Sequence, residues 1–517
     1  MESIKILWAD DEIELLKPHV LFLEEKGYHV STANSGNDAL DLLQKNNYDI
    51  IFLDENMPGL SGLETLAKIK NISSDVPVVM VTKSEEESIM EDAIGSKIAD
   101  YLIKPVNPKQ LLLSIKKNLD NKRLISEKTN SAYQQDFRNI SMQLGDNLDY
   151  QEWTDVHRKL VFWELELEKL RDNGMVEVLN MQKREANSQF SKFIEKNYVS
   201  WVNGSAKEIP IQSHTLFSKK ILPYLQEEGP TFLVVIDNLR FDQWKAIQPL
   251  IADYFKTDQE ELFYSILPTA TQYARNALFA GLMPSQIEKL YPKLWVNDDE
   301  EGGKNLHEEE LLAEQLKRLG KQVKFSYTKV TNIHAGKKLP DSVSNMMSNK
   351  LNVIVYNFVD MLSHARTEMD MIRELADEEP AYRSLTVSWF EHSPLFEAIK
   401  MIADKKARLI ITTDHGTVQV KEPSKIIGDR NVNSNLRYKQ GKSLDYNKKD
   451  VFEIKNPADA FLPKNNVSSA YVFAKEDKYF VYPNNYAQFV NYYKNTFQHG
   501  GISMEEVLIP FVALSAK

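Results

Sequence analysis

Short apolar runs that alternate with amphipathic helical segments constrain the fold of this chain more than any other feature. In the first 120 residues the apolar runs are IKILWA, DIIFLD, VPVVMVT and DYLIKP, at residues 4–9, 49–54, 76–82 and 100–105. Segments with helical spacing separate them, for example GNDALDLLQKN at 36–46. Continuous apolar runs of this length are typical of parallel strands that are buried on both faces. The alternation therefore predicts an α/β fold with a doubly wound parallel sheet.

Polar residues stand where these predicted strands end. Asp10 and Asp11 end the first strand, Asp54 the third, Thr82 the fourth and Lys104 the fifth. In open α/β sheets, functional residues lie at the carboxyl ends of the strands. Three carboxylates at one edge repel each other unless a hard cation such as Mg²⁺ lies among them. The cation would also neutralise an incoming phosphoryl group, which makes Asp54 a candidate nucleophile.

Four motifs in this segment resemble the receiver domain of response regulators. They are DDE at 10–12, LDENMPGLSG at 53–62, VTKSE at 81–85 and YLIKP at 101–105. The resemblance implies a CheY-like, flavodoxin-like receiver in which Asp54 accepts the phosphoryl group and the Lys104-Pro105 peptide is cis. The Mg²⁺ ligands that it implies are Asp11, Asp54 and the Asn56 carbonyl, with Asp10 contributing through a water molecule. The phosphoryl-contact and switch residues that it implies are Thr82, Lys104 and Tyr101. A flavodoxin-like domain with incidental acids is the alternative.

The middle of the chain has a helical pattern throughout. Predicted helices cover 153–172 and 176–202, with Asn173-Gly174 as the break between them, and an earlier one leads out of the receiver. We therefore predict three parts, which are a receiver at 1–121, a helical bundle at 122–205 and a C-terminal domain at 206–517.

Aromatic side chains in the first of these helices are expected in a core or interface. They are Trp153, Phe162 and Trp163, and Leu165 is expected to join them. His157 is expected at the surface or at a helix cap.

In the C-terminal part, metal-ligand residue types again follow apolar runs. The residues are Asp237, Thr271, Asp360, His364, Asp414, His415 and His499. A lone Asp–His pair is more often a surface ion pair, but here the residues follow successive strands and so meet at one edge of a sheet. The spacing of Asp360 and His364 puts both on one face of a helical turn. We interpret the seven residues together as one two-metal site. Imidazole and carboxylate ligands suit zinc.

The order of these ligands and the stretch PTATQYARNALFAGLMP at 268–284 resemble the alkaline phosphatase superfamily, specifically its nucleotide pyrophosphatase/phosphodiesterase branch. By that resemblance the domain is alkaline-phosphatase-like, Thr271 is the nucleophile and diesters are the substrates. It implies two Zn²⁺ ions. The first would be held by Asp360, His364 and His499, and the second by Asp237, Asp414, His415 and the Thr271 oxygen. A catalytically silent scaffold is the alternative.

Three further features of the C-terminal domain leave two interpretations each. Arg275, one turn after Thr271, is either a weak candidate for binding a substrate phosphate or a member of a structural ion pair. Residues 421–449 are rich in Lys and Arg, and form either an electrostatic funnel for a polyanionic substrate or a solvated polar loop. The aromatic stretch at 479–497 packs in a core or stacks on bases.

Composition excludes several classes of protein. The chain of 517 residues has no cysteine, which excludes disulfides, thiolate metal ligands and cysteine nucleophiles. No segment approaches the roughly 20 apolar residues of a membrane helix. The net charge of −11 argues against a protein that binds nucleic acid over its whole surface, since such proteins are usually basic, and it leaves a local basic patch open. We expect a cytoplasmic protein without membrane insertion or sequence-specific DNA binding.

The order of the three parts resembles PorX-type response regulators, which couple a receiver to a PglZ domain and are associated with type IX secretion. The resemblance implies a zinc-dependent phosphodiesterase for oligonucleotides or for cyclic or linear signalling nucleotides. It also implies a cognate sensor histidine kinase, dimerisation on phosphorylation and contacts with a sigma factor or a secretion-motor protein. The alternative is a phosphorylation-controlled signalling adaptor in which the zinc domain is a docking platform.

Overall fold

The chain divides into two compact units, residues 1–134 and residues 135–517. The computed structural model describes residues 4–73, 76–83, 98–170, 173–298, 300, 302–357, 359, 378–428, 435–464 and 469–517. Over these ranges, no helix combines the length and the apolar character that crossing a membrane requires.

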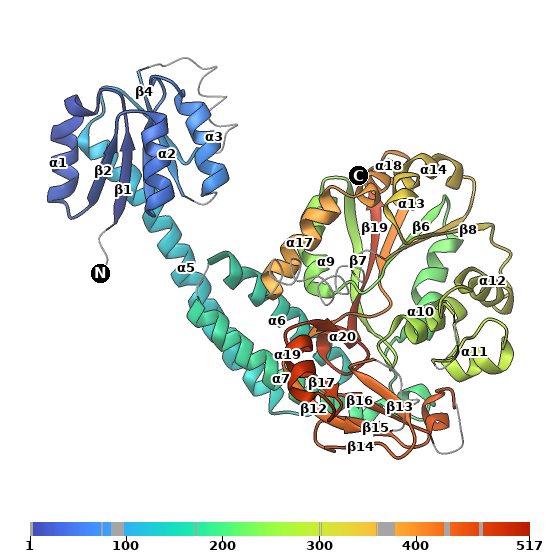
Figure 1. Ribbon diagram of the computed structural model, residues 1–517. Helices are drawn as coiled ribbons and strands as arrows, with labels where there is room; N and C mark the ends of the chain where they lie inside the picture. The colour runs from blue at the N-terminus through green and yellow to red at the C-terminus, as the bar shows by residue number, and fades with distance from the viewer. Residues whose placement is uncertain are drawn as a thin grey trace. The chain divides into compact units, whose positions relative to one another are not determined.

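The first unit is built around a five-stranded parallel sheet with the strand order β2-β1-β3-β4-β5 (Figure 1). The strands are β1 Lys5–Ala9, β2 His29–Ala33, β3 Ile50–Asp54, β4 Val78–Thr82 and β5 Asp100–Ile103. Strands β3 and β4 are buried over their full length, as strands between two helical layers are. The order is that of a doubly wound, flavodoxin-like sheet, so the predicted fold of this part is confirmed.

Helices cover both faces of this sheet because successive side chains of its strands point to opposite sides. Leu7 of β1 belongs to one core together with residues of α2 and α3. The next residue, Trp8, belongs to the core on the other face, together with residues of α1 and α5. The helices are α1 Lys17–Glu25, α2 Gly36–Lys45, α3 Gly62–Ile72 and α5 Pro108–Leu144.

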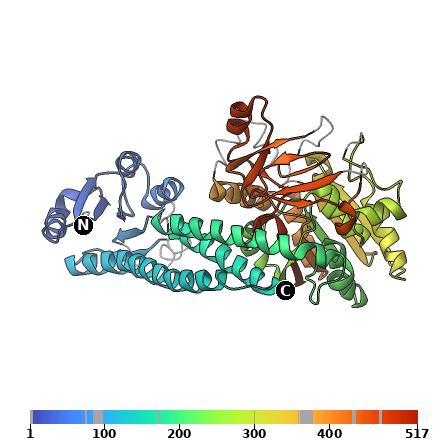
Figure 2. The same cartoon turned by 90° about the horizontal axis from the view of Figure 1, so that it is seen from below.

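Helices α5, α6 (Tyr150–Leu170) and α7 (Asn173–Val202) confirm the helical middle of the chain. Helix α5 is continuous through residue 134, where the two compact units divide. Within the second unit, α6 and α7 lie side by side (Figure 2). The Gln182 side chain of α7 donates to the Phe137 carbonyl of α5 at 2.9 Å. The three helices therefore pack together.

Burial of the aromatic residues in α6 follows the expectation only in part. Trp153 and Trp163 are buried, and the Trp163 indole donates to Asp136 at 3.0 Å. Phe162 is instead 54% exposed, because it lies on the opposite face of α6 from Trp153.

The expectation that His157 lies at the surface is wrong. The side chain is buried, and its ring centroid lies 6.1 Å from that of Phe241 in α9 (Phe241–Ala252). Burial lowers the pKa of His157 to about 4. The side chain that covers His157 belongs to α9, a helix much later in the chain. A local sequence pattern does not reveal such a contact.

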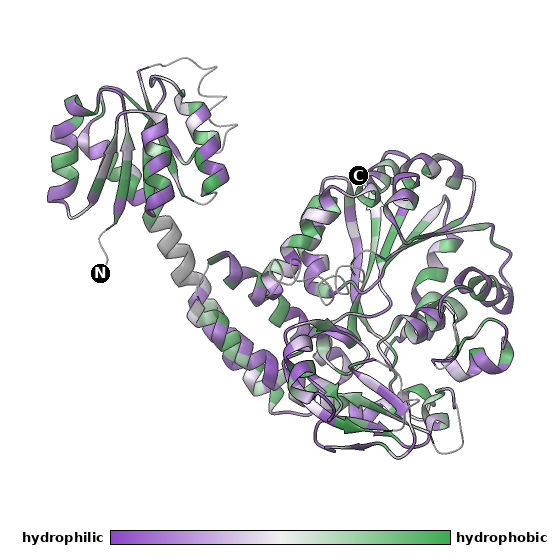
Figure 3. Ribbon diagram, viewed as in Figure 1, coloured by the Kyte–Doolittle hydropathy of each residue, from purple (hydrophilic) through white to green (hydrophobic). Residues whose placement is uncertain are grey.

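A six-stranded sheet forms the centre of the second unit, with the strand order β7-β19-β10-β6-β9-β8. Strands β10, β6, β9 and β8 are parallel, and β19 pairs antiparallel with β10 and β7. The bounds are β6 Thr231–Ile236, β7 Phe255–Tyr264, β8 Phe325–Val330, β9 Leu351–Tyr356, β10 Arg408–Thr412 and β19 Leu508–Ala516. Hydrophobic residues concentrate in its inner strands (Figure 3). This mixed α/β unit fits the predicted fold class.

Helices surround this sheet. Helices α9, α14, α17 and α18 share one large hydrophobic core with it. The remaining bounds are α8 Ser213–Leu216, α10 Thr271–Ala280, α11 Pro284–Leu290, α12 Glu308–Arg318, α13 Ile333–Lys337, α14 Leu339–Met346, α17 Glu379–Glu391, α18 Pro394–Asp404, α19 Tyr486–Tyr493 and α20 Met504–Val507.

Smaller sheets replace much of the polar loop expected at 421–449. The strands are β11 Val418–Gln419, β12 Glu422–Ile427, β13 Tyr438–Gly441, β14 Asp445–Tyr446, β15 Val451–Ile454, β16 Ala470–Ala474, β17 Lys478–Val481 and β18 Phe497–Gln498. Arg437 is fully buried and binds Glu506 at 2.6 Å, and Lys439 is also buried. These two cations therefore do not belong to a solvent-facing funnel. Residues 429–434, with Arg430, lie outside the described residues.

The aromatic stretch at 479–497 packs in a core only in part, and its stacking on bases stays a prediction. Tyr479 and Phe480 are fully buried and pack in the cores of the small sheets. Phe489 and Tyr492 of α19 are 38% and 40% exposed. Core packing therefore accounts for β17, and not for the outer face of α19.

Candidate phosphorylation and metal sites

Strand ends of the receiver bring the predicted phosphorylation residues together. The Lys104 ammonium lies 2.7 Å from an Asp10 oxygen and 2.6 Å from an Asp54 oxygen. Asp10, Asp54 and Thr82 are buried. The backbone N–H of Asn56 donates to Asp54 at 3.1 Å. The Asp54 carboxylate is thus held at the edge of the sheet beside the Lys104 ammonium.

Three carboxylates of this edge have the geometry that a cation needs. Asp10, Asp11 and Asp54 each offer an oxygen, and these oxygens lie within 4.8 Å of one another. Burial raises the pKa of Asp54, the Lys104 hydrogen bond opposes that shift, and the charge of Asp10 adds to it. All-oxygen ligands of this kind suit Mg²⁺. The donor set therefore fits the predicted ion.

The switch residues lie on the neighbouring strands β4 and β5. Thr82, the last residue of β4, donates its hydroxyl to Glu55. Tyr101 of β5 is partly buried, and this burial raises its pKa. The Lys104-Pro105 peptide is cis, as expected.

In the second unit, β6 and β10 deliver three ligand residues to one point. Asp237 follows β6, and Asp414 and His415 follow β10. Each offers one ligand atom, and the three atoms lie within 4.8 Å of one another. All three side chains are at most 1% exposed. Parallel pairing of the two strands, with Val235 opposite Thr412, places their carboxyl ends side by side.

Thr271 lies at the N-terminus of α10 and faces this group. Its hydroxyl is 3.0 Å from His415 Nε2 and 3.5 Å from Asp237 Oδ1. Ala270 is the N-cap residue, so Thr271, which carries the hydroxyl, is the first residue of α10. The first backbone N–H groups of a helix have no partner within it, and they attract anions. The turn therefore combines a hydroxyl, an imidazole and helix N–H groups at one place.

Two histidines present Nε2 as their acceptor nitrogen. His415 Nδ1 lies 3.0 Å from the Gly416 carbonyl, and His499 Nδ1 lies 3.1 Å from the Thr269 carbonyl. A carbonyl only accepts, so both Nδ1 atoms carry the proton. The two rings stack at a centroid distance of 4.3 Å. A histidine that donates its other N–H in this way is oriented as metal ligands usually are.

The remaining two predicted zinc ligands, Asp360 and His364, lie outside the described residues. Among the described ones, the carboxylates and imidazole nitrogen of Asp237, Asp414 and His415 are the types that zinc prefers. Their burial also favours a cation, because carboxylates in the interior need a counter-charge. The donor set fits zinc.

Arg275 supplies a protein counter-charge beneath the site. Its guanidinium is 1% exposed and lies 2.7 Å from Asp237, 2.5 Å from Glu308 and 3.8 Å from Asp414. Burial raises the pKa of Asp237 to about 6, and the neighbouring Arg275 limits that rise. These contacts are those of a structural ion pair, which was one of the two interpretations. A contact between Arg275 and substrate stays a prediction.

Several residues of the site carry no signal in the sequence. The Asn305 amide donates to the Thr271 carbonyl at 3.0 Å. Glu308 is buried and binds both Arg275 and Lys329. Thr269 accepts from the Gly500 N–H at 3.0 Å and donates to the Gly501 carbonyl at 2.9 Å. Thr269 therefore holds the backbone next to His499 in place. Its position in the sequence motif does not reveal this structural role.

Comparisons with known proteins divide the chain into three matched regions. A response regulator receiver domain model matches residues 6–116, and a PorX response regulator linker domain model matches 123–202. The model of the BREX system PglZ alkaline phosphatase-like domain matches 216–514.

Individual relatives match the receiver region. The alginate biosynthesis transcriptional regulatory protein AlgB of Pseudomonas putida is 39% identical over 120 residues, which are 23% of this chain and 27% of AlgB. A transcriptional regulatory protein CpxR homolog of Haemophilus influenzae is 40% identical over 114 residues, which are 22% of this chain and 48% of the homolog. The chain thus spans less than half of the length of either protein. A receiver domain structure from Clostridium thermocellum is 32% identical and covers 23% of this chain and 98% of its own, with a TM-score of 0.23.

The fold and the matched regions define a two-component response regulator with an alkaline-phosphatase-like output domain, and a receiver implies a cognate kinase. The chain belongs to the PglZ alkaline-phosphatase-like family, and its order of receiver, linker and PglZ domain is that of PorX-type response regulators.

Proposed function

We propose that this response regulator is a zinc-dependent phosphodiesterase with Thr271 as its nucleophile. The observation that carries the proposal is the position of the Thr271 hydroxyl, 3.0 Å from His415 Nε2 and beside the buried group of Asp237, Asp414 and His415. A partly buried hydroxyl among metal-ligand side chains, at a helix N-terminus, is what phosphoryl transfer through a covalent intermediate needs.

The reaction has two displacements at phosphorus. The Thr271 oxygen attacks the phosphorus of a diester, the bond to one ester oxygen breaks, and an alcohol leaves with a proton. Water then attacks the phosphothreonine, the bond between phosphorus and the Thr271 oxygen breaks, and a monoester is released. Backbone N–H groups at the start of α10 bind a phosphoryl oxygen in both steps.

Bound zinc would lower the pKa of the Thr271 hydroxyl and neutralise charge on the phosphoryl oxygens. Asp237, Asp414, His415 and Thr271 would hold one ion, and the resemblance assigns Asp360, His364 and His499 to the second. Oligonucleotides and cyclic or linear signalling nucleotides are the proposed substrates.

The receiver is proposed to control this activity or the assembly of the protein. Asp54 would accept a phosphoryl group from a sensor histidine kinase with Mg²⁺ at Asp10 and Asp11, and Lys104 would neutralise the product. Homodimerisation on phosphorylation follows from the resemblance. So do contacts with a sigma factor or a secretion-motor protein, a role in type IX secretion and a cytoplasmic location.

Hydrolysis of chromogenic esters tests the enzymatic part. The full chain, loaded with zinc, should hydrolyse bis-p-nitrophenyl phosphate faster than p-nitrophenyl phosphate, and a chelator should stop both reactions. His392→Ala serves as a control, since His392 lies at the end of α17 and its side chain, among the described residues, bonds its own helix at the Ser388 carbonyl, at 2.8 Å. Zinc binding without hydrolysis of either ester would contradict the enzyme and agree with the adaptor alternative.

A further inference from the structure

The segment of residues 499–507, here called the His499 segment, contacts the loop of Thr269 at its beginning and the loop of His415 at its end. It contains His499, and its contact with Thr269 holds its beginning. Its end reaches the loop of His415, because the N–H of Gly416 donates to the Glu506 carbonyl at 3.1 Å. A Cβ atom at Gly416 would lie 1.9 Å from the Glu505 carbonyl oxygen, so only glycine permits this approach. The backbone of the His499 segment therefore fixes the positions of both histidines.

Asn187 of α7 binds the His499 segment from the outside. Its side chain is 8% exposed. The amide oxygen accepts the backbone N–H of Met504 at 2.7 Å, and the amide nitrogen donates to the Glu505 carboxylate at 3.0 Å. One asparagine thus satisfies a backbone donor and a side-chain acceptor of α20 with both ends of its amide.

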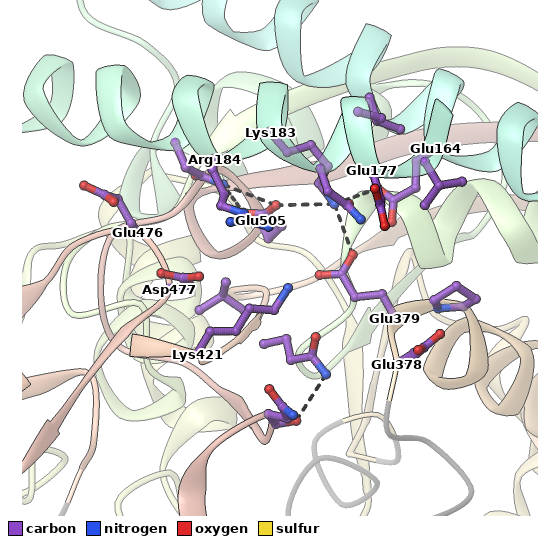
Figure 4. A pocket seen from close by; sticks show the side chains of 18 of the residues that line it. Glu164, Glu177, Lys183, Arg184, Glu378, Glu379, Lys421, Glu476, Asp477 and Glu505 are labelled. Atoms are coloured by element: carbon purple, nitrogen blue, oxygen red, sulfur yellow. Dashed lines mark hydrogen bonds and ion pairs between the residues drawn. The ribbon is translucent and has the colours of Figure 1, made fainter. Parts of the chain in front are cut away.

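Neighbouring residues of α7 add weaker contacts with the same segment. Lys183, one turn before Asn187, reaches toward Glu505 at 3.9 Å and also binds Glu164 and Glu379 at 2.8 and 3.0 Å (Figure 4). These side chains line a cleft of about 940 Å³. Because Lys183 has three carboxylates near it, it is not specific for the His499 segment, whereas both bonds of Asn187 go to α20.

We propose that Asn187 is a positioning residue of the metal site, which acts through the His499 segment on His499 and His415. The inference rests on the proposed zinc function for its effect on metal binding, but the ordering of the segment by Asn187 does not require zinc. It makes helix α7, which lies in the matched linker region, a structural part of the output domain's site. Groups that hydrogen-bond a metal ligand directly change metal affinity by about 10- to 100-fold when they are lost, so a residue that acts through the backbone of the His499 segment should change it by up to about 10-fold.

The helix that carries Asn187 also contacts α5. Gln182, five residues earlier, donates to Phe137 and Ser141 of α5 at 2.9 and 3.0 Å. A shift of α7 relative to the output domain would therefore act on the metal ligands through two hydrogen bonds of one side chain.

Two measurements on the full chain test the proposal. Hydrogen exchange, measured in chelator, reports how well the backbone amides of the His499 segment are protected when no metal is bound. Zinc affinity is measured by competition with a chromogenic chelator. N187A should make the Met504 amide exchange about 3- to 10-fold faster, since a net hydrogen bond is lost. It should weaken zinc binding by up to about 10-fold, which is less than the loss of a direct partner of a ligand would cause. N180A is the matched control, because Asn180 is exposed on the same helix, and it should change neither quantity.

A donor–acceptor exchange separates positioning from general stability. N187D keeps the acceptor for Met504 but places a second carboxylate beside Glu505, so it should weaken zinc binding as N187A does. Adding E505Q supplies an amide that donates to the carboxylate at position 187, and Lys183 remains one turn from that charge. The double variant should regain most of the wild-type zinc affinity.

The outcomes distinguish this inference from the proposed function. If N187A lowers the thermal midpoint but binds zinc as tightly as the wild type does, Asn187 is only structural and the inference is wrong. The same conclusion follows if the double variant binds zinc no better than N187D. Wild-type protein that binds no zinc contradicts the proposed function, whereas faster exchange of the His499 segment in N187A alone still supports its positioning by Asn187.

Discussion

Replacing Arg275 by methionine should destabilise the metal-free protein far more than a surface substitution does. The guanidinium is 1% exposed, and it lies 2.7 Å from Asp237 and 3.8 Å from Asp414. Methionine fills much of the same volume but leaves these carboxylates without their protein cation. Glu308 keeps Lys329 at 2.8 Å, so the loss falls mainly on the two metal-ligand carboxylates.

Breaking a buried ion pair by removing one partner costs about 3–5 kcal/mol. The entropy of unfolding is about 2.1 cal/mol/K per residue, which over residues 135–517 converts this loss into a shift of the midpoint by about 4–6 °C. Lys317→Met is the matched control, because the Lys317 side chain is 79% exposed and its pair with Glu314 at 3.7 Å lies on the surface. Such a pair contributes about 0–1 kcal/mol.

Thermal unfolding of the second unit, followed by calorimetry in chelator and in zinc, measures both effects. In chelator, Arg275→Met should lose about 4–6 °C and Lys317→Met about 1 °C or less. Zinc should reduce the deficit of Arg275→Met, because a bound cation replaces the lost charge at Asp237 and Asp414. Equal losses in the two variants, or a deficit that zinc leaves unchanged, would refute the reasoning.

Three other expectations concern single residues. The pKa of His157 is about 4 in the folded state and 6.5 ordinarily, so the unfolded chain takes up the proton first. Stability present above pH 6.5 should fall by up to about 3 kcal/mol as the pH drops to 4, and His157→Gln should flatten that part of the curve of midpoint against pH. Thr269→Ala should slow diester hydrolysis less than Thr271→Ala does, since the Thr269 hydroxyl bonds the backbone of Gly500 and Gly501 and the Thr271 hydroxyl lies beside His415. Equal losses would leave the nucleophile unassigned. Beryllofluoride with Mg²⁺ should convert a monomer to a dimer by light scattering, with Asp54→Ala as the control, and an unchanged mass over a wide concentration range would mean that the switch acts within one chain.

Strand patterns made the ligand positions predictable. Asp54, Asp237 and Asp414 each follow a continuous apolar run, and such runs end at one edge of a parallel sheet. The structure brings Asp237, Asp414 and His415 together at that edge, and Thr271, the first residue of α10, lies beside them. The receiver fold was predictable for the same reason, since its alternation of strands and helices is regular and local.

Burial of polar and charged residues was not predictable from such patterns. Arg437 was expected in a polar loop, but its partner Glu506 lies 69 positions away. His157 and Asn187 stand on helices whose polar faces look solvated in the sequence, and both are buried against the PglZ domain by tertiary packing. A local sequence pattern predicts that a segment is helical, but it does not predict which distant part of the chain packs against the helix.

Turnover by Thr271 variants with measured zinc content tests the central claim most directly. Thr271→Ala removes the nucleophile and keeps Asp237, Asp414 and His415, so it should retain zinc and lose hydrolysis of bis-p-nitrophenyl phosphate. Thr271→Ser keeps a hydroxyl at the start of α10 and should retain part of the activity. Full activity in zinc-loaded Thr271→Ala would contradict the mechanism.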